Sequence, residues 1–283
     1  MKTPVPLPDA EYFTHEAMHT TFSLRIPGMD ETTARGIARE CFEQIDLLES
    51  RLSRFIEGSD VSRINCMAAG ETLYLSETCH QCLLLALDAA ASTHGLFDIT
   101  IGARIEHRKS GNANPEPPLA GRLTIHPDVP AITCDEAGRE IDLGGIGKGF
   151  ALDQLKLMLA DWGVENALLA AGASSLLAIG KQPWPVDLTG DADVLRLELA
   201  NQSISASGTG IQGCHIIHPW GPEAMPDNPS RRIWVTATTA ALAEIWSTAL
   251  MLIDVEDIPE ILAGNQNVTS VHADRGGKVE IIL

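Results

Sequence analysis

Apolar residues recur at two different spacings along the chain, and each spacing predicts a different kind of element. After Asp30, a suitable helix N-cap, apolar positions step by three and four residues, which is the period of an amphipathic helix. These positions are Ile37, Cys41, Ile45, Leu48 and Leu52. The same spacing predicts three more helices: residues 76–93, the segment after Lys148 with Leu152, Leu155, Leu159 and Trp162 on its buried face, and residues 238–253.

Short apolar runs between turn-forming residues predict strands. They span residues 19–26, 123–142, 166–169, 174–179, 196–199, 203–207, 233–237, 268–271 and 279–283. Strands and helices mix without strict β-α-β alternation, so we predict an α+β fold with mixed or antiparallel sheets and packed helices. We expect the proline-rich residues 1–15 to form a loose arm, and residues 16–283 to form a single domain or two closely packed lobes. Residues 107–120, rich in proline and glycine, are predicted to be a mobile excursion.

Charge and composition narrow the function classes. The chain has 283 residues, of which 45% are hydrophobic and 20% charged, and its formal net charge is −18. This composition is ordinary for a soluble globular protein, and the acidity argues against sequence-independent binding of nucleic acid. No apolar run is long enough to span a bilayer. The first residues show neither the apolar region of a signal peptide nor a lipobox cysteine, so we expect a cytoplasmic protein unless the sequence is a trimmed form.

Residues 141–153 carry the strongest chemical pattern in the chain. A glycine-rich turn there lies between a short apolar strand and a predicted helix, and it contains Gly144, Gly145, Gly147, Lys148 and Gly149. Glycine lets backbone N–H groups approach a ligand closely, and a helix N-terminus favours an anion such as phosphate. The spacing matches neither a P-loop nor a dinucleotide fingerprint. Two interpretations stay open: a pyrophosphate or nucleotide site, and a tight strand-to-helix turn whose glycines allow close packing.

Two other patterns could hold a metal ion. Cys79 and Cys82 form a C-x-x-C, but no second pair completes a closed zinc site, and two free thiols on a helix explain the spacing better than a redox site. Glu244 and Thr248 lie four residues apart on the predicted last helix and share one face. That face is otherwise apolar, so the carboxylate needs a partner, which a hard cation could supply. The alternative is an exposed Glu244 and a Thr248 bonded back to its own helix.

Ordered blocks along nearly the whole chain resemble the motifs of the FAD:protein FMN transferases, the ApbE family. The central block, residues 142–153, is similar to Asp-Leu-Gly-Gly-Ile-Ala-Lys-Gly-Tyr-Ala-x-Asp. The other blocks are residues 18–23 (a Met-Gly-Thr strand), 52–55 with 59–65 (a flavin-contacting loop), 97–102 (Phe-Asp-Pro-Thr-Val-Gly), 171–174 (Ala-Gly-Gly-Asp), 215–219 (His-Ile-Ile-Asp-Pro) and 243–249 (Ala-Asp-Ala-x-Ser-Thr-Ala). No single block is specific, but the ordered set is, and it implies the fold of that family.

The resemblance also implies an activity and a site. Members bind FAD and a divalent cation, usually Mg²⁺, and move FMN onto a Ser or Thr hydroxyl of an acceptor protein with release of AMP; some hydrolyse FAD to FMN and AMP instead. Catalytic roles fall on His215 and Lys148, and a metal site on the Gly147 carbonyl, Glu244 and Thr248. The residues that the resemblance places at FAD are Met18, Phe55, Asp60, Ser62, Asp98, Gly144, Gly145, Lys148, Asp153 and Gly172.

Five departures from the family motifs fall on expected site positions. His19 and Ala173 stand where the family has glycine, and Ser174, His218 and Glu244 stand where it has aspartate. The added methylene of glutamate shifts the carboxylate, which Ca²⁺ tolerates better than Mg²⁺ because Mg²⁺ demands octahedral geometry. Such changes leave two alternatives to a transferase open: a non-catalytic flavin- or partner-binding descendant of the family, and an FAD pyrophosphatase.

Overall fold

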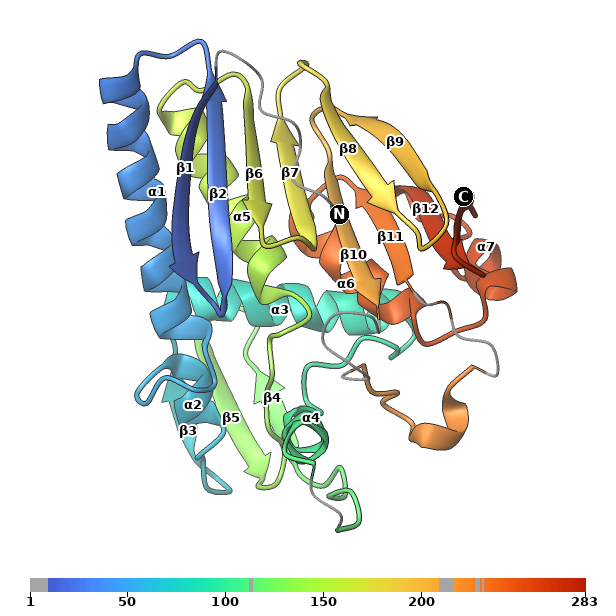
Figure 1. Cartoon of the computed structure of the whole chain (residues 1–283). Coiled ribbons are helices and arrows are strands. Elements are labelled where there is room, and N and C mark those ends of the chain that lie inside the picture. Colours follow the sequence, from blue (N-terminus) through green and yellow to red (C-terminus); the bar gives the residue numbers. More distant parts are fainter. Residues whose placement is uncertain (1–9, 112–113, 209–215, 227–229, 231) are drawn as a thin grey trace.

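The computed structural model describes residues 10–111, 114–208, 216–226, 230 and 232–283. Its centre is an eight-stranded antiparallel sheet with the strand order β1-β2-β6-β7-β10-β11-β12-β13 (Figure 1). The strands are β1 Ala10–Ala17, β2 Thr20–Pro27, β6 Ala167–Ala171, β7 Ser175–Ile179, β10 Ser203–Gly208, β11 Arg232–Ala237, β12 Val268–Arg275 and β13 Lys278–Ile281. The fold is α+β with antiparallel sheets, as the mixed order of elements predicted.

Two smaller sheets accompany the large one. One has the order β3-β5-β4, with β3 Thr72–Tyr74, β4 Arg122–Ile125 and β5 Ala131–Glu136. The other is the hairpin of β8 Trp184–Thr189 and β9 Val194–Leu199. The helices are α1 Glu31–Leu52, α2 Asp60–Ile64, α3 Glu77–Ser92, α4 Gly102–Lys109, α5 Gly147–Asp161, α6 Ala240–Leu250 and α7 Ile258–Ile261, with short 3-10 turns at Pro222–Ala224 and Val255–Asp257. None of the helices in the described ranges is long and apolar enough to cross a bilayer.

Three helices begin where the sequence places an N-cap. The side chain of Asp30 accepts a hydrogen bond from Thr33 N at the start of α1. Ser76 and Thr239 cap α3 and α6 in the same way. Each cap satisfies a backbone donor that the first helical turn leaves without a partner, so a short polar side chain before an apolar run is enough to fix these boundaries.

The large sheet is buried on both faces. Helices α5 and α6 pack on one face, and the β8–β9 hairpin covers the other over its middle strands (Figure 1). Strand β6 shows the result, because Leu169 faces the helices while Leu168 joins Trp184 and Trp234 in a second core under the hairpin. A strand covered on both sides has no polar alternation, which explains the unbroken apolar run of β6.

Several expected boundaries were wrong. Strand β1 begins at Ala10, inside the segment expected to be a loose arm, because its backbone pairs with β2 along the whole strand and the Arg25 guanidinium lies 4.1 Å from the ring centroid of Tyr12. The expected excursion over residues 107–120 begins inside helix α4. Trp162, expected in the core, is 48% exposed and donates to Glu40. Strand β8 was missed because its two prolines, Pro183 just before it and Pro185 within it, mask the alternation of buried residues.

Candidate active site

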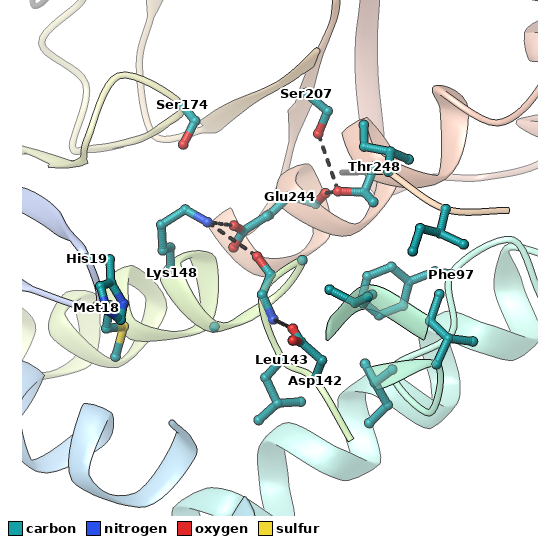
Figure 2. A pocket seen from close by; sticks show the side chains of 18 of the residues that line it. Met18, His19, Phe97, Asp142, Leu143, Lys148, Ser174, Ser207, Glu244 and Thr248 are labelled. Atoms are coloured by element: carbon teal, nitrogen blue, oxygen red, sulfur yellow. Dashed lines mark hydrogen bonds and ion pairs between the residues drawn. The ribbon is translucent and has the colours of Figure 1, made fainter. Parts of the chain in front are cut away.

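A cavity of about 730 Å³ opens between the large sheet, the end of α1, α5 and α6. A pocket of this size suits a cofactor. Chain segments far apart in the sequence line it: the β1–β2 turn, the end of α1, residues 96–101, the glycine-rich turn, the residues after Gly172, the end of β10 and one face of α6. The topology therefore brings together most of the blocks that the sequence singled out (Figure 2).

The glycine-rich turn is shaped by Asp142 and leads into α5. Asp142 Oδ1 accepts from Gly144 N at 2.8 Å, and a Cβ on Gly144 would lie 2.8 Å from the same oxygen. A Cβ on Gly145 would lie 3.0 Å from the ring of Phe97. A Cβ at Gly144 would therefore press on the Asp142 side chain that accepts this hydrogen bond, and one at Gly145 would make a tight contact with Phe97. The N-cap residue Ile146 makes no side-chain hydrogen bond to α5, and Gly147 and Lys148 of the first turn line the cavity, where the dipole of the helix favours an anion.

Gly149 lets α5 approach α6 closely. A Cβ there would collide with the backbone oxygen of Ala240 and lie 2.7 Å from Ala241 Cα. At this crossing, a carboxylate on each helix accepts hydrogen bonds from backbone N–H groups of the other helix. Glu244 Oε2 on α6 accepts from Gly149 N at 2.7 Å, and Asp153 on α5 accepts from Ala240 N and Ala241 N at 2.8 and 2.9 Å. Both interpretations of the glycine motif therefore apply to one turn: part of it packs, and part of it faces the cavity.

Lys148 and Glu244 form an ion pair at the wall of the cavity (Figure 2). Glu244 is 4% exposed, as the apolar face of α6 predicts, while the side chain of Lys148 keeps 24% of its surface exposed. Lys148 Nζ also lies 3.4 Å from the carbonyl oxygen of Gly144. The buried carboxylate is thus neutralised by an ammonium group and a backbone amide, which avoids the high cost of an unpaired buried charge.

The same corner offers oxygen atoms of the kind that a hard cation prefers. Thr248 Oγ1 donates to its own helix at Glu244 O (3.0 Å) and lies 3.3 Å from Ser207 Oγ, which in turn lies 2.9 Å from Ser247 Oγ (Figure 2). Glu244, Thr248 and Gly147 all line the cavity. Carboxylate, hydroxyl and carbonyl oxygens suit Mg²⁺ or Ca²⁺, and the ammonium of Lys148 stands in for a cation at the carboxylate. The donor set fits a divalent ion, although no cluster of three His, Cys, Asp or Glu side chains gathers within the described ranges.

Aromatic and sulfur side chains line another part of the cavity. Met18 and His19 adopt positive φ angles of 50° and 55° in the tight β1–β2 turn, a conformation that two-residue hairpin turns require. Both side chains line the cavity, and the ring of His19 meets the 60% exposed Phe55 edge-on at 6.0 Å. Asp98 also lines it and accepts from the backbone and hydroxyl of Thr100. His19, which stands where the family has glycine, therefore lies at the cavity itself.

Four residues expected at FAD do not line the cavity. Asp60 is buried and accepts from Ser76 N at 3.0 Å, while the Ser62 hydroxyl donates to Ser59 O, so both support the α2 region. Asp153 ties α6 to α5, and burial raises its pKa to about 6. Gly172, with φ 59°, forms the β6–β7 turn, and its neighbours Ala173 and Ser174 face the cavity instead.

The structure describes only one of the two histidines that the sequence singled out in residues 215–219. His215, expected to be catalytic, lies outside the described residues. His218 is 3% exposed, its Nδ1 accepts from Trp220 N at 3.2 Å, and burial lowers its pKa. It does not line the cavity, so the exchange of aspartate for histidine at this position acts on local packing.

Cys79 and Cys82 behave as core residues. Both are fully buried on α3. Burial raises the pKa of Cys79 to about 12 and raises that of Cys82 well above its usual range. Because the thiolate is the form that binds metal and attacks disulfides, this pair is unsuited to redox or zinc chemistry.

Arg54 is a site residue that the sequence reasoning missed. Its side chain is 11% exposed and lines the cavity. It donates to Gly102 O at 2.9 Å, to Glu140 Oε2 at 2.6 Å and to Asp142 Oδ2 at 3.3 Å. Through Asp142 it supports the glycine-rich turn. The available signal was its place in the block of residues 52–55, from which only Phe55 was singled out as a site residue.

Comparison with known proteins agrees with the resemblance to the ApbE family. The chain matches the model of the ApbE family over residues 18–272. FAD:protein FMN transferase from Klebsiella pneumoniae (strain 342) is 24% identical over 296 residues, which cover 91% of this chain and 82% of that protein. The FAD:protein FMN transferase of Buchnera aphidicola subsp. Schizaphis graminum (strain Sg) is 27% identical over 257 residues, covering 80% and 75%.

Solved structures show the same fold. The flavinyl transferase ApbE of Pseudomonas stutzeri in its apo form superposes with a TM-score of 0.81 at 20% identity, covering 96% of this chain and 94% of that one. The ApbE protein of Thermotoga maritima also gives 0.81, at 21% identity, covering 96% and 97%. The match of the family model extends over most of the chain, and the chain therefore belongs to the ApbE family.

Proposed function

We propose that the cavity binds FAD and that the protein transfers the FMN moiety to a Ser or Thr hydroxyl of an acceptor protein with release of AMP. The observation that carries this proposal is the convergence of Lys148, the first turn of α5 and the oxygen atoms of Glu244 and Thr248 on the wall of one cavity of about 730 Å³. A diphosphate needs such a wall, because its charge must be neutralised in a chain whose net charge is −18.

The chain's own residues would orient FAD by position and charge. Phe55 and Met18 offer an apolar surface to the flavin ring, and Lys148 with the amides of α5 faces the diphosphate. An oxygen of the acceptor hydroxyl forms a bond to the FMN-side phosphorus, the bond from that phosphorus to the bridging oxygen breaks, and AMP leaves with that oxygen. The resemblance implies that His215 either positions FAD or assists transfer of the proton from the acceptor hydroxyl. Positioning of this kind supplies a large part of catalysis in phosphoryl transfer.

Glu244, Thr248 and the Gly147 carbonyl would hold a divalent cation, with Mg²⁺ as the first candidate. When bound, such an ion supplies positive charge to the diphosphate oxygens and orients them. The chemistry of these donors supports the assignment, since all three residues line the same cavity and offer oxygen atoms.

Chromatography of the nucleotide products tests the proposal. The full-length protein is incubated with FAD and Mg²⁺, with and without a cell extract as the source of acceptor, and protein-bound flavin is read by in-gel fluorescence. Transfer predicts AMP without an equal amount of free FMN, and a fluorescent acceptor band. Equal AMP and FMN without extract would identify an FAD pyrophosphatase, and bound FAD without AMP would identify a flavin-binding module; either result contradicts transfer. Lys148→Met should abolish the release of AMP and the fluorescent acceptor band. Lys156→Met removes the same charge from the same helix and should leave both unchanged.

A further inference from the structure

Both oxygens of the Glu244 carboxylate have partners within the protein. Oε1 pairs with Lys148 Nζ, and Oε2 accepts from Gly149 N at 2.7 Å. The carboxylate is nearly inaccessible, with 6% of its side chain exposed. A divalent cation that binds Glu244 must therefore take the place of the ammonium group, because two positive charges at one buried carboxylate would repel each other strongly.

The ammonium group, by contrast, is free to leave. The Lys148 side chain is 24% exposed, and lysine carries its charge on a flexible four-carbon stem. Lys148 lies in the first turn of α5, next to the turn proposed to bind the diphosphate. Its second partner, the Gly144 carbonyl, is at 3.4 Å, which is a weak contact. The same side chain can thus reach Glu244 or an anion in the cavity, but leaving Glu244 without any cation would be costly.

We propose that Lys148 is the residue that sets the cation requirement of the site, by exchange. Without nucleotide, its ammonium group occupies Glu244; when a divalent cation and FAD bind, the cation takes the carboxylate and the ammonium group moves to the diphosphate. This inference rests on the proposed function. It implies that the cation and FAD strengthen each other's binding by the same factor, since the coupling is reciprocal.

Calorimetric titration of Mg²⁺ into nucleotide-free protein tests the exchange without any need for activity. In Lys148→Met the cation no longer has to displace an ammonium group, so we expect Mg²⁺ to bind at least about tenfold more tightly than to the wild type, a difference of about 1.4 kcal/mol. Lys156→Met removes the same charge from the same helix outside the cavity and should bind Mg²⁺ as the wild type does. Equal or weaker binding of Mg²⁺ to Lys148→Met than to the wild type would overturn the proposal.

Glu244→Gln provides the second arm, which also decides the question where Lys148→Met does not fold. Without the carboxylate, the ammonium group is available to the diphosphate from the start. We expect FAD, titrated in the presence of EDTA, to bind at least about fivefold more tightly to Glu244→Gln than to the wild type, and added Mg²⁺ to give no further gain. Metal-free FAD binding that is unchanged or weaker in this variant would contradict the exchange. If wild-type protein binds neither FAD nor Mg²⁺ under any condition, the proposed function itself fails, a result distinct from either of these.

Discussion

Replacing Arg54 with alanine is expected to destabilise the protein strongly, because the residue is the buried partner of two carboxylates. It makes three hydrogen bonds, and Asp142 on its far side is only 7% exposed as a side chain. Breaking a buried pair by removing one partner costs about 3–5 kcal/mol, since the remaining charge is left uncompensated. Loss of the ion pair with Glu140 adds little to this free energy, because its side chain is 38% exposed and water can replace the arginine.

The melting temperature is the simplest measurement of this loss. At about 2–4 °C per kcal/mol for a domain of this size class, Arg54→Ala should melt at least about 6 °C below the wild type. On the proposed function, the Michaelis constant for FAD should rise as well, because Asp142 holds Gly144 N in the turn proposed to bind the diphosphate. Arg54→Lys should recover little, since one ammonium group cannot reproduce the arginine fork.

Arg196 offers a matched control for Arg54. It also makes two hydrogen bonds to one carboxylate, at 2.7 and 3.0 Å to Asp187, but its side chain is 59% exposed. Exposed pairs contribute about 0–1 kcal/mol, so Arg196→Ala should shift the melting temperature by a few degrees at most. Equal shifts for the two variants would refute the reasoning, since they would mean that burial of the pair does not decide its contribution.

Three further outcomes are expected. Gly149→Ala should cost at least about 2 kcal/mol in chemical denaturation because its Cβ would overlap the backbone of α6, whereas Gly36→Ala, with nothing near its Cβ, should gain about 0.5–1 kcal/mol; a neutral Gly149→Ala would contradict the close helix crossing. Burial raises the pKa of Asp153 from 3.8 to about 6, so its contribution to stability is fully present below about pH 4 and is lost as the pH rises through 6. The melting temperature of the wild type minus that of Asp153→Asn should therefore increase from pH 7 to pH 4. A difference that does not change with pH would contradict the raised pKa. The Cys79 thiol, buried and with its pKa raised to about 12, should resist a thiol reagent at pH 8 that labels the exposed Cys66, as peptide mapping would show, and rapid labelling of both would contradict its burial.

Much of the fold was predictable because local signals fixed it. Polar N-caps at Asp30, Ser76 and Thr239 start three helices where the sequence indicated. Glycine spacing also located the turn into α5. The errors arose where tertiary packing overrides local pattern: Trp162 caps the end of a helix at the surface, and β1 is a strand only because β2 pairs with it.

The sequence predicted which residues line the candidate site better than it predicted which partners they contact. Periodicity placed Glu244 on a buried face but could not show that Lys148, far away in the sequence, would be its partner. Asp60 and Asp153 matched family motifs, yet their carboxylates bind backbone N–H groups away from the cavity. Arg54 lay in the block of residues 52–55 but was not singled out, since its importance comes from carboxylates that only the fold brings near.

The crossing of α5 and α6 restricts how this protein can change over time. Each helix lends an acidic side chain to the beginning of the other, Glu244 in one direction and Asp153 in the other. A substitution of either acid removes the counter-charge of a neighbouring helix as well as its own interaction. A replacement at Glu244 that is meant to change what the cavity binds would therefore also alter how α5 is seated, so its effect on folding has to be measured beside its effect on binding.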